Sequence, residues 1–336
     1  TGGVIVAGRR QKKSGRRSYA WRYRGRIVAC VFVEVIIICA LVIMIGWNKG
    51  VKEWFEQFEQ PVLKEVDISG INSPNAILMQ ARGGKILGEI NGEAQIYPAS
   101  MTKIMTVILG IENFDDLDEK ITLTDEMFAG LYEQDATQAG FQPGEEVRVI
   151  DLLYGAMLPS GAECCIALAD TISGSEADFA ELMNKKARKL GMENTHFCDS
   201  TGLHNPDHYS TVKDIAVLMK YCIKNDTFRE IVETSRHSTG VTNIHPDGIT
   251  YYSTMFKNLS DPTVTGGKIL GGKTGYTSEA GHCLVSFAEI EGREYIFVSA
   301  GASGADGNTI PHIQDAVNVY NRVGAAIEAK MNDNNK

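Results

Sequence analysis

The sequence predicts an α+β protein: an antiparallel sheet covered by helices, with an inserted helical subdomain, preceded by one N-terminal transmembrane helix. Three observations support this fold class. Strand-like segments occur near the start and the end of the main body, helical patterns fill the stretch between them, and an amphipathic helix closes the chain. Strands grouped apart from helices are typical of α+β domains.

The N-terminal segment predicts a membrane anchor. Residues 1–26 form a basic tail with nine Lys and Arg and no acid. Residues 27–47 are apolar except for Glu34, and 21 residues are enough to cross a bilayer as a helix. Basic residues before the span favour a cytoplasmic N-terminus and a body outside the cell membrane. Because no small-x-small cleavage pattern follows, we expect a single-pass signal anchor rather than the alternative, a cleaved signal peptide.

Charge and cysteine content limit the classes of partner. After residue 26 the chain has 24 Lys and Arg against 42 Asp and Glu, a net charge of −18. The basic tail directly abuts the predicted span, so we expect membrane contact and no nucleic-acid binding. Five cysteines lie outside the span, an odd number without zinc-finger spacing, which predicts small buried hydrophobic residues rather than disulfides.

The rest of the chain divides into a stalk at residues 48–67, a catalytic body at 68–328 and a polar tail at 329–336. The stalk is amphipathic and interrupted by Pro61. Within the body, Gly-containing turns separate the expected strands, Pro98 and Ser100 begin a helix, and apolar residues at helical spacing mark the last helix. The expected strands are 76–81, 85–90, 271–277, 282–289 and 294–300. The expected helices are 100–111 and 313–327, and between them, from about 115 to 235, helical patterns that include 151–158 and a helix from 163 alternate with loops.

Ser100 and Lys103 form a Ser-x-x-Lys pair at a predicted helix start. Free backbone N–H groups surround a serine in that position, and a lysine three residues later lies on the same helix face. If Lys103 is buried near a second cation, for which Lys273 is the candidate, its pKa falls enough to accept the serine proton. A second such pair, Ser210 and Lys213, is interpreted as a helix cap, because Ser210 and Thr211 precede Asp214 and an apolar run. About one Ser-x-x-Lys match is expected by chance in a chain of this length.

A Gly-rich strand and a loop serine supply partners for this pair. Lys273 and Thr274 are suited to bind a carboxylate, and Gly275 leaves room for a substrate backbone. The backbone N–H of Tyr276, with that of Ser100, is a candidate oxyanion hole. Ser160 is a candidate proton relay between Lys103 and a leaving amine. The plainer alternatives are a capped helix with an exposed lysine and an ordinary Gly-rich hairpin.

In this order, Ser-x-x-Lys, a middle serine motif and Lys-Thr-Gly resemble the signature of penicillin-binding proteins and serine β-lactamases. Over about residues 70–325 the chain is similar to the D-alanyl-D-alanine carboxypeptidases (peptidase family S11) among the low-molecular-mass penicillin-binding proteins. The segments that carry this likeness are 97–106, 142–147, 151–155, 200–204 and 208–211.

The resemblance implies a β-lactamase/DD-peptidase-like fold and assigns the site residues. Ser100 is the implied acyl-ester nucleophile, Lys103 the proton acceptor and Ser160 the proton relay. The strand from Lys273 through Thr274 and Gly275 to Tyr276 is implied to bind substrate. No cofactor and no metal are expected. Pro206, between His204 and His208, also disfavours the helix that a zinc site on these histidines needs.

One position departs from the family pattern. The middle motif is usually Ser-x-Asn, but here the third residue is Ala162. Loss of one hydrogen bond near charged groups costs roughly 1.5–3 kcal/mol, or about ten- to a few-hundred-fold in rate. Glu163 or a water is a candidate to compensate for the missing amide.

We therefore expect a membrane-anchored D-Ala-D-Ala carboxypeptidase that acts on peptidoglycan pentapeptides and is acylated by β-lactams. Two alternatives remain open on the sequence alone. One is a serine β-lactamase, although no dedicated deacylation glutamate can be assigned. The other is a catalytically weak penicillin-binding protein that acts as a β-lactam sensor or scaffold, which the substitution at Ala162 favours.

Overall fold

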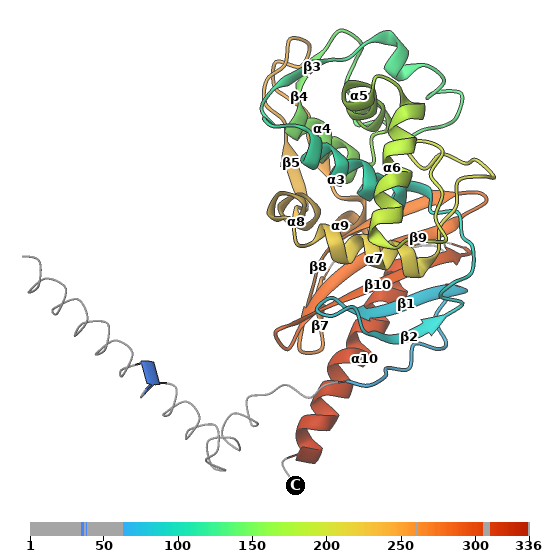
Figure 1. Ribbon diagram of the computed structural model, residues 1–336, viewed down its shortest axis with the longest axis vertical. Helices are drawn as coiled ribbons and strands as arrows, with labels where there is room; N and C mark the ends of the chain where they lie inside the picture. The colour runs from blue at the N-terminus through green and yellow to red at the C-terminus, as the bar shows by residue number, and fades with distance from the viewer. Residues whose placement is uncertain (1–34, 37, 39–62, 260, 305–309, 335–336) are drawn as a thin grey trace, which may run out of the picture. The chain divides into compact units, whose positions relative to one another are not determined.

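A six-stranded antiparallel sheet forms the centre of the body (Figure 1). The computed structural model describes residues 63–259, 261–304 and 310–334, together with 35, 36 and 38. The strands lie in the order β2-β1-β10-β9-β8-β7. Their bounds are β1 Asn75–Gln80, β2 Ile86–Ile90, β7 Thr263–Val264, β8 Gly267–Thr277, β9 Gly281–Ile290 and β10 Arg293–Ala302. All five strands that we predicted are present.

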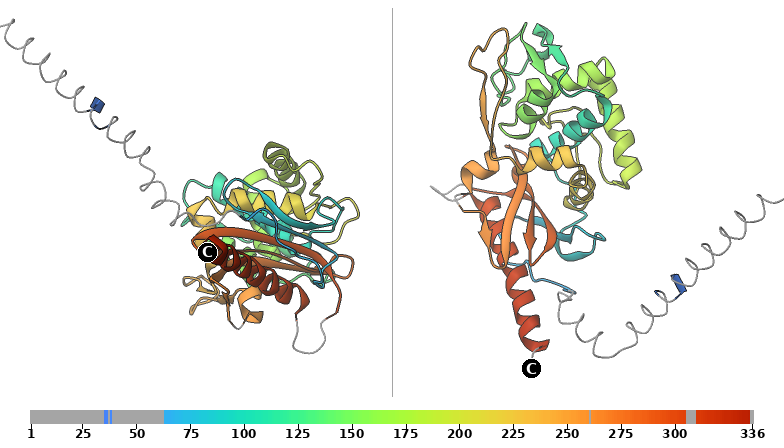
Figure 2. Two further views of the ribbon diagram at one scale, coloured as in Figure 1. Left: turned by 90° about the horizontal axis from the view of Figure 1, so that it is seen from below. Right: turned by 90° about the vertical axis from the view of Figure 1, so that its left-hand side faces the viewer.

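Helices cover both faces of this sheet, as Figure 2 shows from two further sides. Successive strand residues point to opposite faces. Ile77 and Val298 therefore join a large core beneath the helical subdomain, whereas Leu78 and Phe297 join a second core beneath helix α10 (Pro311–Asn334). The predicted closing helix is thus present, and it continues to Asn334 through most of the tail that we expected at 329–336.

The helical subdomain is inserted between β2 and β7, as predicted. Its elements are η1 Ala99–Thr102, α3 Lys103–Asn113, β3 Lys120–Thr122, η2 Asp125–Phe128, β4 Glu146–Arg148, α4 Val149–Met157, α5 Ala162–Ser173, α6 Glu176–Leu190, α7 Val212–Cys222, α8 Asp226–Glu233, β5 Arg236–Ser238, β6 Thr250–Tyr252 and α9 Thr254–Asn258. The small hairpins β3–β4 and β5–β6 were not predicted, because strands of three residues are too short to show an alternating pattern.

Two local predictions need correction. Thr211, not Ser210, caps α7, since its side chain accepts from the backbone N–H of Asp214, while Ser210 is buried and lies 2.8 Å from the Thr195 hydroxyl. The last residues of the predicted stalk belong to the body: Leu63 and Val66 are buried in the α10-side core.

Most of the predicted anchor lies outside the described residues. Contacts divide the chain into two units, Thr1–Gln60 and Pro61–Lys336. Neither the basic tail at 1–26 nor the stalk up to residue 62 is described, and within the span at 27–47 only Val35, Ile36 and Ile38 are, as exposed helical residues. In the part of the chain that the structure describes, no helix combines the length and apolarity needed to cross a membrane.

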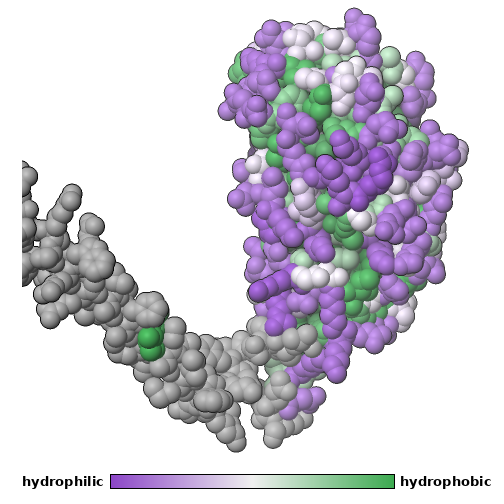
Figure 3. Space-filling view, in the orientation of Figure 1, coloured by the Kyte–Doolittle hydropathy of each residue, from purple (hydrophilic) through white to green (hydrophobic). Residues whose placement is uncertain are grey.

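The surface of the body is mostly hydrophilic on the face seen in Figure 3, with apolar residues scattered between polar ones. Such scattered apolar residues are ordinary on a folded domain. The five cysteines of the body are unpaired, and four of them are buried, as we predicted.

Candidate active site

Ser100 lies in the short η1 turn that leads into α3. The α-helix itself begins at Lys103, three residues later than predicted, because η1 is a 3-10 turn. Ala99, just before the serine, has a left-handed φ of +46°. A non-glycine residue in that region stores strain, which is often found at functional sites.

Lys103 points at the serine. Its Nζ donates to Ser100 Oγ at 3.0 Å and to the carbonyl oxygen of Thr201 at 2.7 Å. The side chain is only 4% exposed. Ser100 and Lys103 are thus positioned as a nucleophile and a buried base.

Ser160 approaches the same hydroxyl from the loop between α4 and α5. Its Oγ donates to Ser100 Oγ at 3.0 Å, and its φ of +74° is again left-handed. The loop is fixed by backbone bonds from the Gly161 N–H to Gly155 (2.8 Å) and from the Ala162 N–H to Thr137 (2.8 Å). The structure therefore brings all three predicted catalytic residues together.

Strand β8 forms the adjoining wall of the site. An added Cβ at Gly275 would lie 3.0 Å from the Ser100 nitrogen, so the strand passes directly against the nucleophile and tolerates little bulk there. Thr274 Oγ1 lies 2.6 Å from Thr254 Oγ1, and Lys273 Nζ donates to the Thr274 carbonyl at 3.0 Å. Tyr276 is 61% exposed at the rim.

Burial sets the electrostatics of the two lysines. Desolvation lowers the pKa of Lys103, while nearby acidic groups, including Asp199, oppose the shift. Lys273 is 1% exposed, and desolvation together with the positive charge of Lys103 lowers its pKa well below the usual range. Burial rather than a second cation is thus the main cause of the lowered pKa at Lys103.

Cys165 is a buried thiol whose pKa is influenced by the charges of both Lys103 and Lys273. Desolvation raises its pKa to about 12 despite these cations. The thiol therefore stays protonated, and Ser100 is the nucleophile that this site activates.

Glu163, next to Ala162, bonds to the loop at Ala139 and Gly140. Its Oε1 accepts from the backbone N–H groups of Ala139 at 2.6 Å and Gly140 at 2.9 Å, and its Oε2 is buried without a partner. Burial raises the pKa of this carboxyl. Glu163, one of the two candidates to compensate for Ala162, thus uses Oε1 to fix the neighbouring loop.

Sequence reasoning missed the support behind Lys103. Asp199, Thr201 and His208 lie on the loop between α6 and α7, which reaches the base of the site. In the sequence, segments 200–204 and 208–211 contributed to the family resemblance, but that resemblance assigned no function to Thr201 or His208. Across the described residues, no group of three or more His, Cys, Asp or Glu side chains is placed to hold a metal ion.

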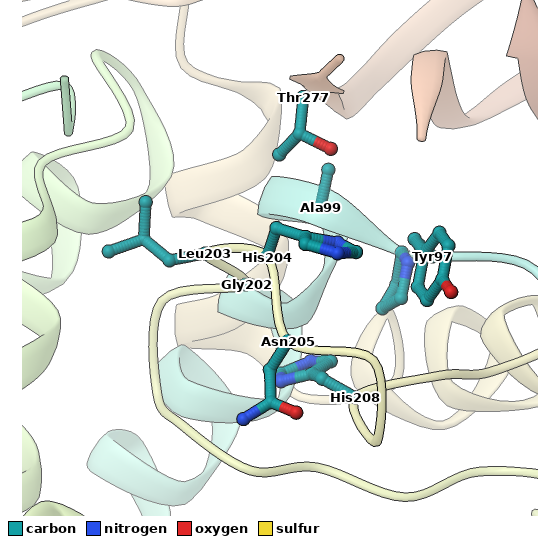
Figure 4. A pocket seen from close by; sticks show the side chains of 9 residues that line it. Tyr97, Ala99, Gly202, Leu203, His204, Asn205, His208 and Thr277 are labelled. Carbon is teal, nitrogen blue, oxygen red and sulfur yellow. The ribbon is translucent and has the colours of Figure 1, made fainter. Parts of the chain in front are cut away.

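A shallow pocket opens beside this machinery (Figure 4). Its lining includes Tyr97, Ala99, His204, His208 and Thr277. The Tyr97 and His204 rings meet edge to face, with centroids 4.8 Å apart. The pocket joins the η1 turn, the 199–208 loop and the end of β8 in one continuous surface.

Such an arrangement is equipped for acyl transfer. A serine hydroxyl within hydrogen-bond distance of a buried amine fits nucleophilic catalysis with an adjacent base. A second hydroxyl 3.0 Å away can relay the proton, and an open strand next to it can hold an extended substrate.

Comparisons with known proteins indicate which family the chain belongs to. A sequence profile of the D-alanyl-D-alanine carboxypeptidases, peptidase S11, matches residues 62–304. The chain is 35% identical over 231 residues to D-alanyl-D-alanine carboxypeptidase DacF of Bacillus subtilis, covering 68% of this chain and 57% of that protein. It is 33% identical over 262 residues to D-alanyl-D-alanine carboxypeptidase DacC of Escherichia coli, covering 70% and 58%.

These two curated relatives are longer, since the chain spans less than two thirds of their length. A solved Streptomyces DD-transpeptidase superposes with a TM-score of 0.68 at 30% identity, covering 78% of this chain and all of that one. With the profile spanning well over half of the sequence, the chain belongs to the D-alanyl-D-alanine carboxypeptidase family, peptidase S11.

Proposed function

We propose that this protein is a membrane-anchored serine D-Ala-D-Ala carboxypeptidase, which removes the terminal D-alanine from peptidoglycan stem pentapeptides. The observation that carries the proposal is the placing of Ser100 Oγ 3.0 Å from both Lys103 Nζ and Ser160 Oγ. Family membership and the adjoining Lys273–Tyr276 strand support the same substrate class.

Acylation follows from this geometry. Neutral Lys103 accepts the proton of Ser100 Oγ while the oxygen attacks the carbonyl carbon between the two D-alanines. Ser160 gives its proton to the leaving amine and regains one from Lys103. The backbone N–H groups of Ser100 and Tyr276 stabilise the oxyanion. Free D-alanine leaves, and the shortened peptide remains as an ester on Ser100.

Hydrolysis of this ester reverses the proton path. Water attacks the ester carbonyl and gives one proton to Lys103, and Ser100 Oγ regains a proton as the peptide leaves. A β-lactam presents a cyclic amide to the same serine, and its opened ring stays tethered to the acyl group. We therefore expect β-lactams to acylate Ser100.

Substrate orientation is assigned to β8. The terminal carboxylate lies beside Thr274 and within the field of Lys273, and the bare backbone at Gly275 lets the peptide lie along the strand. The apolar segment at 27–47 holds the protein in the cell membrane with the N-terminus in the cytoplasm and the body outside.

A second candidate rests on Ala162. Without the usual asparagine amide, the protein is acylated by β-lactams but turns peptides over slowly, as a sensor or scaffold. A serine β-lactamase, the remaining alternative, would instead deacylate penicillin quickly.

The test uses the full chain in detergent, with a fluorescent penicillin and a D-Ala-D-Ala-terminated peptide. Ser100→Ala and Lys103→Ala are the variants that remove the proposed nucleophile and base. Ser210→Ala and Lys213→Ala are matched controls from the second Ser-x-x-Lys pair. Labelling and D-alanine release that disappear only in the first two variants support the carboxypeptidase.

The other outcomes separate the alternatives. Stable labelling without D-alanine release favours the sensor or scaffold, and rapid loss of the label as hydrolysed penicillin favours the β-lactamase. Absence of labelling in folded wild-type protein contradicts the assignment of Ser100.

A further inference from the structure

His208 is a buried histidine that the mechanism above does not use. It is 2% exposed, yet both ring nitrogens have partners. Nε2 lies 2.9 Å from the hydroxyl of Thr102, and Nδ1 lies 3.1 Å from Oδ2 of Asp199. Thr102 sits between the nucleophile and the base in the sequence, so this ring contacts the catalytic turn from behind.

Asp199 carries the connection onward. Its Oδ1 accepts from the Thr201 N–H at 2.8 Å, the Thr201 hydroxyl at 2.7 Å and the Gly202 N–H at 2.6 Å. These bonds fold the loop so that the Thr201 carbonyl accepts from Lys103 Nζ at 2.7 Å. The oxygen that holds Lys103 is therefore positioned by the carboxylate that holds His208.

These contacts form a closed path. From Lys103 the path runs through Thr201, Asp199 and His208 to Thr102, and the backbone then returns to Lys103. Nδ1 of His208 is also approached by the backbone N–H of Cys198, 3.2 Å away, so Asp199 and Cys198 together hold the imidazole while Nε2 faces the Thr102 hydroxyl. The order carboxylate, imidazole, hydroxyl resembles a hydrolase triad. However, Thr102 is fully buried and cannot reach a substrate.

A tight backbone contact makes this closed path of contacts sensitive to small shifts of the loop that contains Gly202. Gly202 has a φ of +80°, and a Cβ there would lie 1.9 Å from the Ala99 carbonyl oxygen. The loop is thus pressed against the residue that precedes Ser100. Movement of either side displaces the serine relative to the lysine.

We propose that His208 is a positioning residue, which locks the nucleophile turn to the loop that aims Lys103 at Ser100. The inference rests on the proposed function, because acylation of Ser100 is its readout. A misplacement of about 1 Å at reacting atoms can cost about a hundredfold in rate. Removing the contact between the His208 imidazole and the Thr102 hydroxyl is therefore expected to slow acylation by about 10- to 100-fold.

The experiment measures the second-order rate constant for acylation of the full chain by a fluorescent penicillin. Rates are taken from pH 6 to 10, below the melting temperature of each variant. His208→Gln and Thr102→Val break the contact from either side, Thr102→Ser keeps the hydroxyl, and the double variant combines the two losses. His196→Gln is the control, since His196 lies on the same loop and bonds to the Asp207 carbonyl.

The expected result has three parts. His208→Gln and Thr102→Val each slow acylation by a similar factor at every pH, the double variant is no slower than either, and Thr102→Ser and His196→Gln keep the wild-type rate. Three results overturn the inference: lower melting temperatures with unchanged acylation, losses that multiply in the double variant, or a loss that disappears at high pH. If wild-type protein is not labelled at all, the proposed function fails instead.

Discussion

The acid stability of this protein is expected to depend on Asp199. Burial alone would raise the pKa of this carboxyl, but the hydrogen bond and charge of His208 and the bonds from Thr201 lower it from 3.8 to about 2. At about 1.4 kcal/mol for each pKa unit, the difference corresponds to about 2 kcal/mol of folding free energy. Because the folded-state pKa is the lower one, this stability is present above about pH 4 and is lost as the pH falls through 2.

Asp199→Asn removes this contribution, so urea unfolding of wild type and variant should converge in acid. We expect the difference between their free energies of unfolding to shrink by about 1 to 2 kcal/mol between pH 6 and pH 2.5, from the two pKa values above. Asp207→Asn, an exposed carboxylate on the same loop, is the control and should show no such trend. A difference for Asp199→Asn that stays constant over this range would refute the reasoning.

Three further predictions concern the site. Ala162→Asn restores the missing amide and should raise kcat/KM for D-alanine release about tenfold or more; an unchanged rate would mean that the amide is not limiting. Gly202→Ala places a Cβ against the Ala99 carbonyl at a left-handed φ, so urea unfolding should show a loss of more than about 2 kcal/mol, and a neutral effect would contradict the contact. Because burial lowers the pKa of Lys103, the rate of acylation by a fluorescent penicillin should rise with pH and level off below pH 10.5. An apparent pKa at or above that value in the pH–rate profile would contradict a buried base.

The sequence was sufficient for five of the six strands of the central sheet, for the closing helix and for the residues that meet at Ser100. Those predictions depend on local periodicity and on motif chemistry, which do not require knowledge of distant contacts. The turn before Ser100 was predicted as plain helix, but there Ala99 has a left-handed φ and its carbonyl oxygen lies against Gly202, about a hundred residues away, a contact that local periodicity does not reveal.

Long-range contacts explain the other errors in the same way. The sequence did not show that Oε1 of Glu163 accepts from the loop amides of Ala139 and Gly140. Thr211 replaced Ser210 as the cap of α7, because Ser210 bonds to Thr195 instead. In each case a polar side chain had two local interpretations, and a tertiary partner decided between them.

The two buried lysines have a consequence for engineering this protein. Lys103 and Lys273 are almost fully enclosed, and burying an amine that carries charge in water opposes folding. Apolar replacements of similar length would relieve that cost and remove the chemistry with it. A screen for heat-resistant variants would therefore enrich inactive proteins at these two positions unless each survivor is also tested for penicillin labelling.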